Sequence, residues 1–357
     1  MPVDRSTRRS FLRRIKAKIS RLGLDALLVS DVYDVLYLLG YSSSPPAKLL
    51  IPRKGRAVYF TDPLNETLAR KKITDLAPGS IVAGKDPLEM LKTFLRDNKI
   101  KKLGINEGSL SMREYRTLAA LGRKLDPADA SSVVEEMRKI KKAHEVAIIR
   151  KAARETVSIW KEVRKKIRTG MSEKDIAAMI NVCIHSRGYD NSFPPIVSTG
   201  KNSAYPHAFP TDRRLHKDEH VLVDFGIRYS NYCSDLTRTW DNGRIDRQIR
   251  DFRKLVMEAH DRAIEQIKAG VFTGDLARKI NRYFSFNNVK QFVLHGLGHG
   301  LGLFVHEKPF LNENSRERFR ENMVVTVEPG LYREGLGGIR EEDMVLVTKK
   351  GCEVLTA

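Results

Sequence analysis

Two aspartates interrupt a pair of apolar segments in residues 221–240, VLVDFGIRYSNYCSDLTRTW. Asp224 and Asp235 lie on segments with the alternating pattern of β-strands, and the polar stretch between the segments predicts a hairpin. If Ser230 and Asn231 form a two-residue turn, the two aspartates become diagonal neighbours on one face of the hairpin. Two buried carboxylates on one face need positive charge beside them, so this segment predicts a cation site.

The apolar residues around the two aspartates indicate that both strands are buried. These residues are Val221, Val223, Leu236 and Trp240. The alternative is a pair of surface acids on an exposed sheet face. It is disfavoured because a strand with one exposed face alternates apolar with polar residues along its whole length.

Two more acids accompany apolar segments near the C-terminus. Glu328 ends the segment MVVTVE, and Glu342 lies in GGIREEDMVLV. In the latter segment Arg340, Glu342 and Met344 share one face, because side chains alternate along a strand. Four carboxylates are too many for one divalent ion, but they suit two ions about 3.5–4 Å apart. The pattern therefore predicts a site for two metal ions.

A glycine-rich stretch, HGLGHGLGLFVHE (295–307), contributes three of the nine histidines of the chain. Mixed carboxylate and imidazole ligands without thiolate are typical of Mn²⁺, Co²⁺, Fe²⁺ or Zn²⁺ sites. Without Cβ atoms, the glycines would let the backbone run close to metal and substrate. These glycines are Gly296, Gly298, Gly300 and Gly302. The HExxH zinc helix is excluded because HEKPF lacks the second histidine.

The first part of the chain alternates apolar segments with helical patterns, which predicts a three-layer α/β domain. The expected strands are DALLVS, KLLIP, AVYFTD and KLGIN, and the expected helices are RRSFLRRIKAKISRL, PLNETLARKKI, DPLEMLKTFLRDN and SMREYRTLAALGRK. The polar segment DPADASS (126–132) predicts a linker. We therefore expect an N-terminal domain over residues 1–132 and a C-terminal domain over residues 133–357.

The second part mixes helices with antiparallel strand pairs, which predicts an α+β fold. One long helix is expected over residues 133–168, and Gly170 ends it. Ser172 and Asp175 form a capping-box pattern at the start of the next helix, which Gly188 ends. Further helices are expected over residues 247–268 and from residue 273 onward, and strands are expected at HVLVDFGIRY, YCSDLTRTW, MVVTVEP and GGIREEDMVLV.

Charge and cysteine content limit the class of protein. The net charge of +20 is spread over both parts of the chain and interspersed with acids, which favours solvated helix faces over a nucleic-acid surface. No apolar run reaches the length of about 18 residues that a membrane helix needs. The basic segment STRRSFLRR has no apolar stretch after it, which disfavours an export signal. Three scattered cysteines suit a reducing compartment, so we expect a cytoplasmic protein.

Together these motifs resemble those of the pita-bread metallopeptidases, within them the aminopeptidase P and prolidase branch. SFPPIVSTGKNSAYPHA, VLVDFG…SDLTRTW, HGLGHGLGLFVHE, VEPGLY and GGIREED occur in the order of that family and at compatible separations. DVLYLLGY and AVYFTDPL resemble the creatinase-like N-terminal domain of the same branch. The resemblance implies an α/β creatinase-like domain followed by an α+β pita-bread catalytic domain.

The resemblance also implies roles for the matched residues. The expected metal ligands are Asp224, Asp235, His299, Glu328 and Glu342. Asp235 and Glu342 would bridge two divalent ions. The expected metal is Mn²⁺, and the alternatives are Co²⁺ and Zn²⁺. The expected catalytic and substrate-side residues are His207, His295, His306, Glu328 and Arg340, with Tyr332 in support. Phe304 stands where many relatives carry Asp or Glu, so we expect a changed pocket wall.

The implied reaction is hydrolysis of the Xaa-Pro bond in dipeptides or at the N-terminus of longer peptides, by a cytoplasmic homodimer without nucleic-acid or membrane partners. Glu328 would transfer the proton, and His306 would polarise the carbonyl. Three alternatives stay open. Methionine aminopeptidases share the five ligands but usually lack this N-terminal domain. Creatinase shares the fold without the metal ligands, and some pita-bread proteins are basic binding modules that have generally lost ligands.

Overall fold

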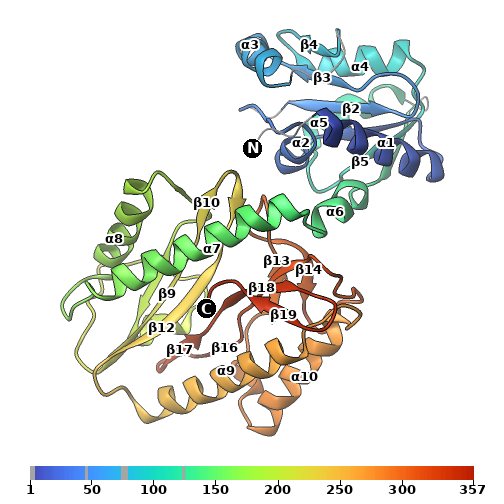
Figure 1. Ribbon diagram of the computed structural model, residues 1–357. Coiled ribbons are helices and arrows are strands. Elements are labelled where there is room, and N and C mark those ends of the chain that lie inside the picture. The colour runs from blue at the N-terminus through green and yellow to red at the C-terminus, as the bar shows by residue number, and fades with distance from the viewer. Residues whose placement is uncertain (1–4, 45–46, 74–78, 123–124) are drawn as a thin grey trace. The chain divides into compact units, whose positions relative to one another are not determined.

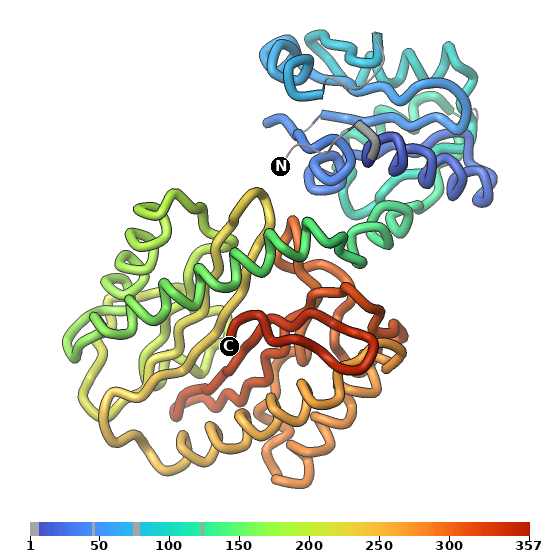
Figure 2. The backbone as a smooth tube through the Cα atoms, in the orientation of Figure 1, coloured from blue at the N-terminus to red at the C-terminus, as the bar shows by residue number. Residues whose placement is uncertain are grey.

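The computed structural model describes residues 5–44, 47–73, 79–122 and 125–357. The chain forms two compact units, Met1–Arg138 and Lys139–Ala357 (Figures 1 and 2). Within the described residues, no helix has the length and apolar character needed to span a membrane.

A mixed six-stranded sheet in the order β4-β3-β2-β1-β5-β6 forms the centre of the N-terminal unit. Its strands are β1 (Ala26–Val29), β2 (Lys48–Pro52), β3 (Val58–Thr61), β4 (Ile81–Ala83), β5 (Lys102–Ile105) and β6 (Asp126–Asp129). The accompanying helices are α1 (Arg5–Arg21), α2 (Val32–Leu39), α3 (Pro63–Lys72), α4 (Pro87–Asp97) and α5 (Met112–Ala119). Because β1 and β2 are buried at every residue, both faces of the sheet are covered, and the predicted α/β class is confirmed.

Helix α4 shows how the local sequence sets these elements. The side chain of Asp86 accepts hydrogen bonds from the first-turn amides, and Pro87 occupies the first turn, where a missing N–H costs nothing. Leu91 and Leu95 then fall one turn apart and pack into the same core cluster as Leu50 of β2. The expected helix over residues 111–124 is shorter, since α5 ends at Ala119, and residues 123–124 lie outside the described residues.

The expected linker at residues 126–132 is wrong, because its first four residues form β6. This strand pairs in parallel with β5, from Lys102 opposite Asp126 to Ile105 opposite Asp129. The polar composition of the segment suggested a turn, but the backbone hydrogen bonds of an edge strand do not depend on apolar side chains.

The expected helix over residues 133–168 is two helices, α6 (Ser132–Lys139) and α7 (Ala143–Arg164). Between them the amide of Lys141 donates to the carbonyl of Asn322, and the Lys141 side chain forms a buried ion pair with Glu307 at 3.4 Å. Contacts with residues far along the chain therefore end α6, which no helix breaker in the sequence indicates.

The C-terminal unit mixes short sheets with two pairs of helices, which confirms the predicted α+β class. Its helices are α7, α8 (Glu173–Ser186), α9 (Arg247–Gln266) and α10 (Thr273–Phe286), with short 3-10 turns η2 (Gly200–Ala204) and η3 (Lys290–Phe292). Its strands are β7 (Asp190–Asn191), β8 (Ile196–Thr199), β9 (Glu219–Phe225), β10 (Ile227–Tyr229), β11 (Tyr232–Cys233), β12 (Leu236–Asn242), β13 (Gly298–Gly300), β14 (Glu307–Leu311), β15 (Val324–Val327), β16 (Gly330–Arg333), β17 (Gly337–Arg340), β18 (Asp343–Val347) and β19 (Cys352–Val354). The main sheets have the orders β12-β9-β8 and β14-β13-β15-β18-β19.

The hairpin that carries the two aspartates has the predicted register. Asp224 faces Thr237, and the strands join at a turn whose two residues, Ser230 and Asn231, have φ angles of 48° and 73°. Positive φ at both positions is the mark of the tight hairpin turn that fits the twist of β-strands. The even loop length places Asp224 and Asp235 on one face.

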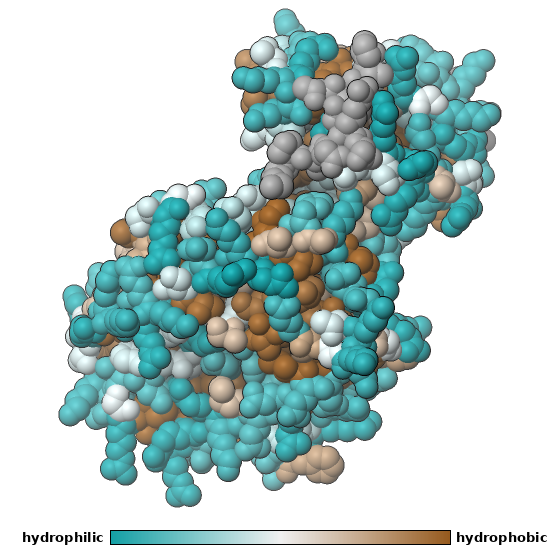
Figure 3. Space-filling model, in the orientation of Figure 1, coloured by the Kyte–Doolittle hydropathy of each residue, from teal (hydrophilic) through white to brown (hydrophobic). Residues whose placement is uncertain are grey.

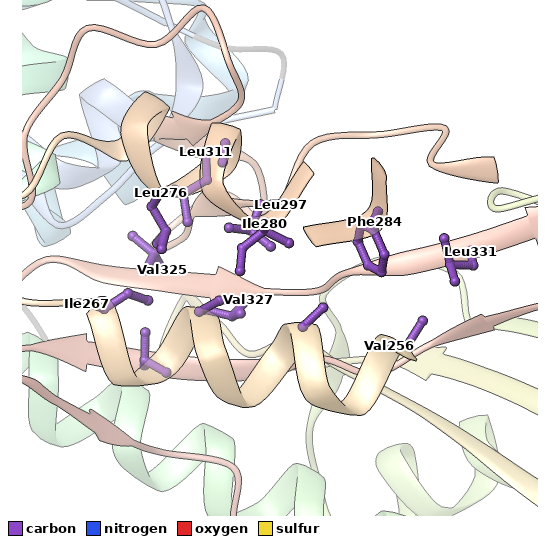
Figure 4. Packing of buried hydrophobic residues seen from close by; sticks show 14 of the residues in the cluster. Val256, Ile267, Leu276, Ile280, Phe284, Leu297, Leu311, Val325, Val327 and Leu331 are labelled. Carbon is purple, nitrogen blue, oxygen red and sulfur yellow. The ribbon is translucent and has the colours of Figure 1, made fainter. Parts of the chain in front are cut away.

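Helices cover one side of these sheets and leave the other for the site. Side chains of α9 and α10 pack against Val325 and Val327 of β15 (Figure 4). Side chains alternate along a strand, so Thr326 and Glu328 point away from this core. Hydrophilic side chains cover much of the face drawn in Figure 3, and hydrophobic ones gather on the C-terminal unit below α7.

Candidate metal centre

The five side chains expected to bind metal line one cavity of about 440 Å³. They come from different elements: Asp224 from β9, Asp235 from the residue before β12, His299 from β13, Glu328 from the residue after β15, and Glu342 from the connection between β17 and β18. Asp235, His299 and Glu342 each offer a ligand atom within 4.8 Å of the others. Nε2 of His299 lies 3.2 Å from Oε1 of Glu328 and 3.7 Å from Oδ2 of Asp235. The fold therefore gathers residues spread from position 224 to position 342.

Three carboxylate oxygens in this cavity are buried without a hydrogen-bond partner: Oδ1 of Asp224, Oδ1 of Asp235 and Oε1 of Glu342. For Asp224 and Glu342 the other oxygen is held by the protein, by Arg340 at 2.6 Å and by the hydroxyl of Thr237 at 2.8 Å. A buried polar atom without a partner is costly. Divalent cations would satisfy these oxygens, so the residues fit a metal centre.

The shifted pKa values of these carboxyl groups point to the same need for positive charge. Burial raises the pKa of Asp235, and the neighbouring Glu342 and Asp224 carboxylates raise it further. Burial and the Glu328 and Asp224 charges raise the pKa of Glu342 in the same way. Burial also raises that of Asp224, although Arg340 opposes the shift. For Glu328, burial is outweighed by the hydrogen bond and charge of His299, and the pKa is about 2. Repulsion among these carboxylates makes cations favourable here.

The guanidinium of Arg340 holds the side chains of this centre in place through hydrogen bonds. Its Nη2 donates to Asp224, its Nη1 to the hydroxyl of Tyr332 at 2.8 Å, and its Nε to the hydroxyl of Thr237 at 3.0 Å. Nε2 of His295 in turn lies 2.8 Å from the Tyr332 hydroxyl. Because Arg340 is only 3% exposed, its guanidinium is a fixed support for Asp224.

The three remaining expected histidines, His207, His295 and His306, all line the same cavity. The rings of His299 and His306 lie edge to face with centroids 4.5 Å apart. Apolar residues also line the cavity: Phe193, Pro194, Pro195 and Ile196, of which Ile196 pairs with Asp224 across β8 and β9. Hydrogen-bonding imidazoles and a compact apolar surface thus both stand beside the carboxylates.

Phe304 does not form the pocket wall that the sequence suggested, because it is not among the residues that line the cavity. Its ring instead meets the edge of His306, with centroids 6.0 Å apart. Its influence on the cavity therefore passes through the position of His306.

The glycines of residues 296–302 serve the expected purpose only in part, because most of them are also needed for close packing of the backbone. A Cβ on Gly298 would lie 2.1 Å from the carbonyl oxygen of Thr326, and one on Gly300 would lie 2.4 Å from that of Lys308. Gly296 and Gly298 do line the cavity, but Gly300 and Gly302 pack against residues 307–308. The glycines chiefly let β13 approach its neighbouring backbones, which positions His299.

Two threonines that the sequence reading missed support the ligands. Thr237 donates to Glu342, and the Thr326 hydroxyl accepts from the amide of His299 and donates to Oε1 of Glu328 at 3.2 Å. Each threonine stands two positions from a ligand, Asp235 or Glu328, on a strand-like segment. Alternation along the strand places both on the ligand face, a signal that could have revealed them.

Comparison with known proteins shows similarity along the whole chain. The model of metallopeptidase family M24 matches residues 147–349, and that of the creatinase/prolidase N-terminal domain matches residues 12–140. The uncharacterized peptidase YqhT of Bacillus subtilis is 29% identical over 97% of both chains, and the uncharacterized peptidase SAB1567 of Staphylococcus aureus is 31% identical over 97% of this chain and 98% of its own.

Solved structures agree. The Xaa-Pro dipeptidase from Bacillus anthracis has a TM-score of 0.91 at 28% identity, covering 98% of this chain and 97% of its own. The X-Pro aminopeptidase from Thermotoga maritima has a TM-score of 0.82 at 31% identity, covering 95% and 97%. The prolidase from Pyrococcus horikoshii has a TM-score of 0.88 at 28% identity, covering 98% of each chain.

Proposed function

The chain belongs to metallopeptidase family M24, and on this premise we propose that it hydrolyses the Xaa-Pro bond of dipeptides or of peptides with proline at the second position. The observation that carries the proposal is the convergence of four carboxylates and His299 in one cavity, with three buried oxygens left for cations. The proposed ligands of two divalent ions are Asp224, Asp235, His299, Glu328 and Glu342. The metal we propose first is Mn²⁺.

The preference for proline is supported by the shape of the cavity wall. The run from Phe193 to Ile196 presents two prolines and two larger apolar side chains beside the carboxylates. Such a surface suits a compact apolar ring and excludes extended polar side chains. The N-terminal domain match also favours this specificity over that of methionine aminopeptidases, and the solved neighbours include an Xaa-Pro dipeptidase and an X-Pro aminopeptidase.

The side chains of the cavity divide the work of hydrolysis. Bound divalent ions would supply Lewis-acid activation of water and of the scissile carbonyl. Glu328 takes the proton from the attacking water and returns it to the proline nitrogen as the peptide bond breaks. His306 and His207 donate hydrogen bonds to the carbonyl oxygen as negative charge develops on it. Arg340 and Tyr332 keep Asp224 and His295 oriented.

The test measures product release from Ala-Pro, Ala-Pro-Ala and Met-Ala by metal-free protein reloaded with Mn²⁺, Co²⁺ or Zn²⁺. We expect cleavage of the two proline substrates. Glu328→Gln should lower kcat by about 10²–10⁴-fold, the usual contribution of a general acid-base group. Glu321→Gln, an exposed change of the same kind, is the matched control. Faster cleavage of Met-Ala than of Ala-Pro would replace the proposal with methionine aminopeptidase activity.

We further propose that the enzyme is a cytoplasmic homodimer. The three cysteines, Cys183, Cys233 and Cys352, are free, which fits a reducing compartment. Light scattering on the purified full chain measures the assembly state, and a mass of one chain at micromolar concentration would contradict the dimer.

A further inference from the structure

A second cavity, of about 640 Å³, lies in the C-terminal unit and shares no lining residue with the metal centre. Its walls come from α7, from β12 and from the last residues of the chain, which lie beside each other in Figure 1. Its floor is apolar and is formed by Val157, Trp160, Leu236 and Trp240. A smaller hollow that shares Val157 and Lys161 continues it along α7 toward Arg154. The two form one groove, which we call the α7 groove.

Cations line one edge of the α7 groove. Arg154, Lys161 and Arg164 repeat at intervals of seven and three residues, which places them on one side of the helix. At a rise of 1.5 Å per residue, Arg154 and Arg164 are about 15 Å apart along the axis. Lys165 and Arg168 extend the row beyond the helix end. This row is longer than a single phosphate group, so its length fits an extended polyanion.

These cations are at most partly neutralised within the groove. Among the described residues that line it, none has an acidic side chain, and the α-carboxylate of Ala357 supplies one negative charge against the five cations of the row. The acids Glu155 and Glu162 of α7 pair instead with Arg187, and Glu162 also pairs with Lys166. Arg238 also lines the groove, but its charge is neutralised because it forms ion pairs with Glu341 and Asp343. The remaining excess of positive charge creates a potential that attracts anions.

Both tryptophans of the chain line this groove. Trp160 is 7% exposed and belongs to the hydrophobic core, so the stacking surface is that of Trp240, which is half-buried on β12. A cationic groove that follows a phosphate backbone, with aromatic side chains on which bases stack, is the chemistry of single-strand binding. An acidic peptide would use the cations but would leave the indole surfaces without a planar partner.

We propose that the α7 groove binds single-stranded nucleic acid, with phosphates along the row from Arg154 to Arg168 and bases against Trp240. The sequence favoured solvated helix faces because acidic residues are interspersed among its lysines and arginines. The fold separates them, since Glu155 and Glu162 pair away from the groove. This site is independent of peptide hydrolysis at the metal centre.

The experiment uses the full-length, metal-loaded protein and labelled oligo(dT) and oligo(U) of about eight nucleotides, within the site sizes known for single-strand-binding grooves. Anisotropy of the label gives affinity, and intrinsic tryptophan emission reports directly on the groove because the chain has no tryptophan elsewhere. We expect saturable quenching and an affinity that falls linearly with the logarithm of salt concentration.

Two matched double variants separate this groove from general surface charge. Arg164→Glu with Arg168→Glu should abolish quenching, and any residual binding should have a salt slope lower by roughly 1.4, about 0.7 for each lost phosphate contact. Arg250→Glu with Lys254→Glu makes the same charge change at the same spacing on exposed residues of α9 and should bind as the unmodified protein does. Equal weakening by both pairs would overturn the proposal.

A second variant tests the aromatic part without changing charge. Trp240→Leu should weaken binding roughly tenfold through lost stacking and leave the salt slope unchanged. Circular dichroism and thermal melting establish that each variant is folded. Absence of oligonucleotide binding at low salt would overturn the proposal. So would polyglutamate or inorganic polyphosphate binding as tightly as oligo(dT), because neither offers a base to stack.

Discussion

Arg340 and Asp224 are joined by a hydrogen bond of 2.6 Å between Nη2 and Oδ2, although 116 residues separate them in the sequence. Both side chains are buried, and the same guanidinium also donates to Tyr332 and Thr237. One oxygen of Asp224 is thereby fixed, and the other stays without a protein partner. The arrangement orients a carboxylate for a cation while balancing part of its charge.

Arg340→Lys is expected to lower affinity for Mn²⁺ by about 10–100-fold, because a lysine supplies one point charge where the guanidinium makes directed hydrogen bonds from each of its nitrogens. Calorimetric titration of metal-free protein with Mn²⁺ measures the change. Arg333→Lys is the control, since Nη1 of Arg333 binds Gln248 and the residue does not line the cavity. An unchanged affinity in the Arg340 variant would remove this residue from the metal centre.

Asp235→Asn should stabilise the metal-free protein and weaken its stabilisation by metal. Burial and three neighbouring carboxylates raise the pKa of Asp235, so its favourable contribution is present below the unfolded value of 3.8 and is lost as pH rises. At neutral pH the charge is a cost that Asn lacks. We expect the Tm in chelator to rise by about 2–4 °C, which corresponds to a gain of about 1 kcal/mol in the free energy of unfolding.

The same change should reduce the shift in Tm that added Mn²⁺ produces, because a ligand is lost. Asp212→Asn, an exposed change of the same type, should alter neither value. A lower Tm of Asp235→Asn in chelator would show that the carboxylates do not repel one another in the folded protein.

His220 should make stability fall in mild acid. Burial and the charge of Arg253 lower its pKa from 6.5 to about 4, so the folded state resists protonation while the unfolded state accepts it. The stabilisation is complete above pH 6.5 and is lost as pH falls toward 4, amounting to about 3 kcal/mol at one pKa unit per 1.36 kcal/mol.

Replacing His220 by Gln should flatten this part of the pH dependence of unfolding by urea, measured between pH 7 and pH 4.5. His185→Gln alters an exposed histidine and should leave the slope as it is. A His220 variant with the full slope of the original protein would assign the pH dependence to other groups.

Gly298→Ala should destabilise the fold and displace His299. The added Cβ would lie 2.1 Å from the Thr326 carbonyl oxygen, a backbone atom that cannot rotate away. We expect a loss of about 1–3 kcal/mol, as for other overpacked sites, together with weaker Mn²⁺ binding. Gly351→Ala meets open space and serves as the control. Unaltered urea unfolding and metal binding would mean that β13 can shift without cost.

The features predicted well from the sequence were local. The register of the hairpin follows from the two-residue turn at Ser230 and Asn231, and the shared face of Asp224 and Asp235 follows from alternation along a strand. The two fold classes follow from the order of strand and helix patterns. The identity of the metal ligands and of the catalytic histidines stays a prediction drawn from resemblance, with a cavity that gathers those residues in its support.

Tertiary structure alone decided the features that depend on distant partners. The break before α7 needs the carbonyl of Asn322, the orientation of Asp224 needs Arg340, and the row of cations at the α7 groove needs Glu155 and Glu162 to pair elsewhere. Backbone geometry fixes which face a residue takes within its own strand or helix, so the sequence carries that information. Which group meets that face across 100 residues or more is set by packing of whole elements, which no local pattern encodes.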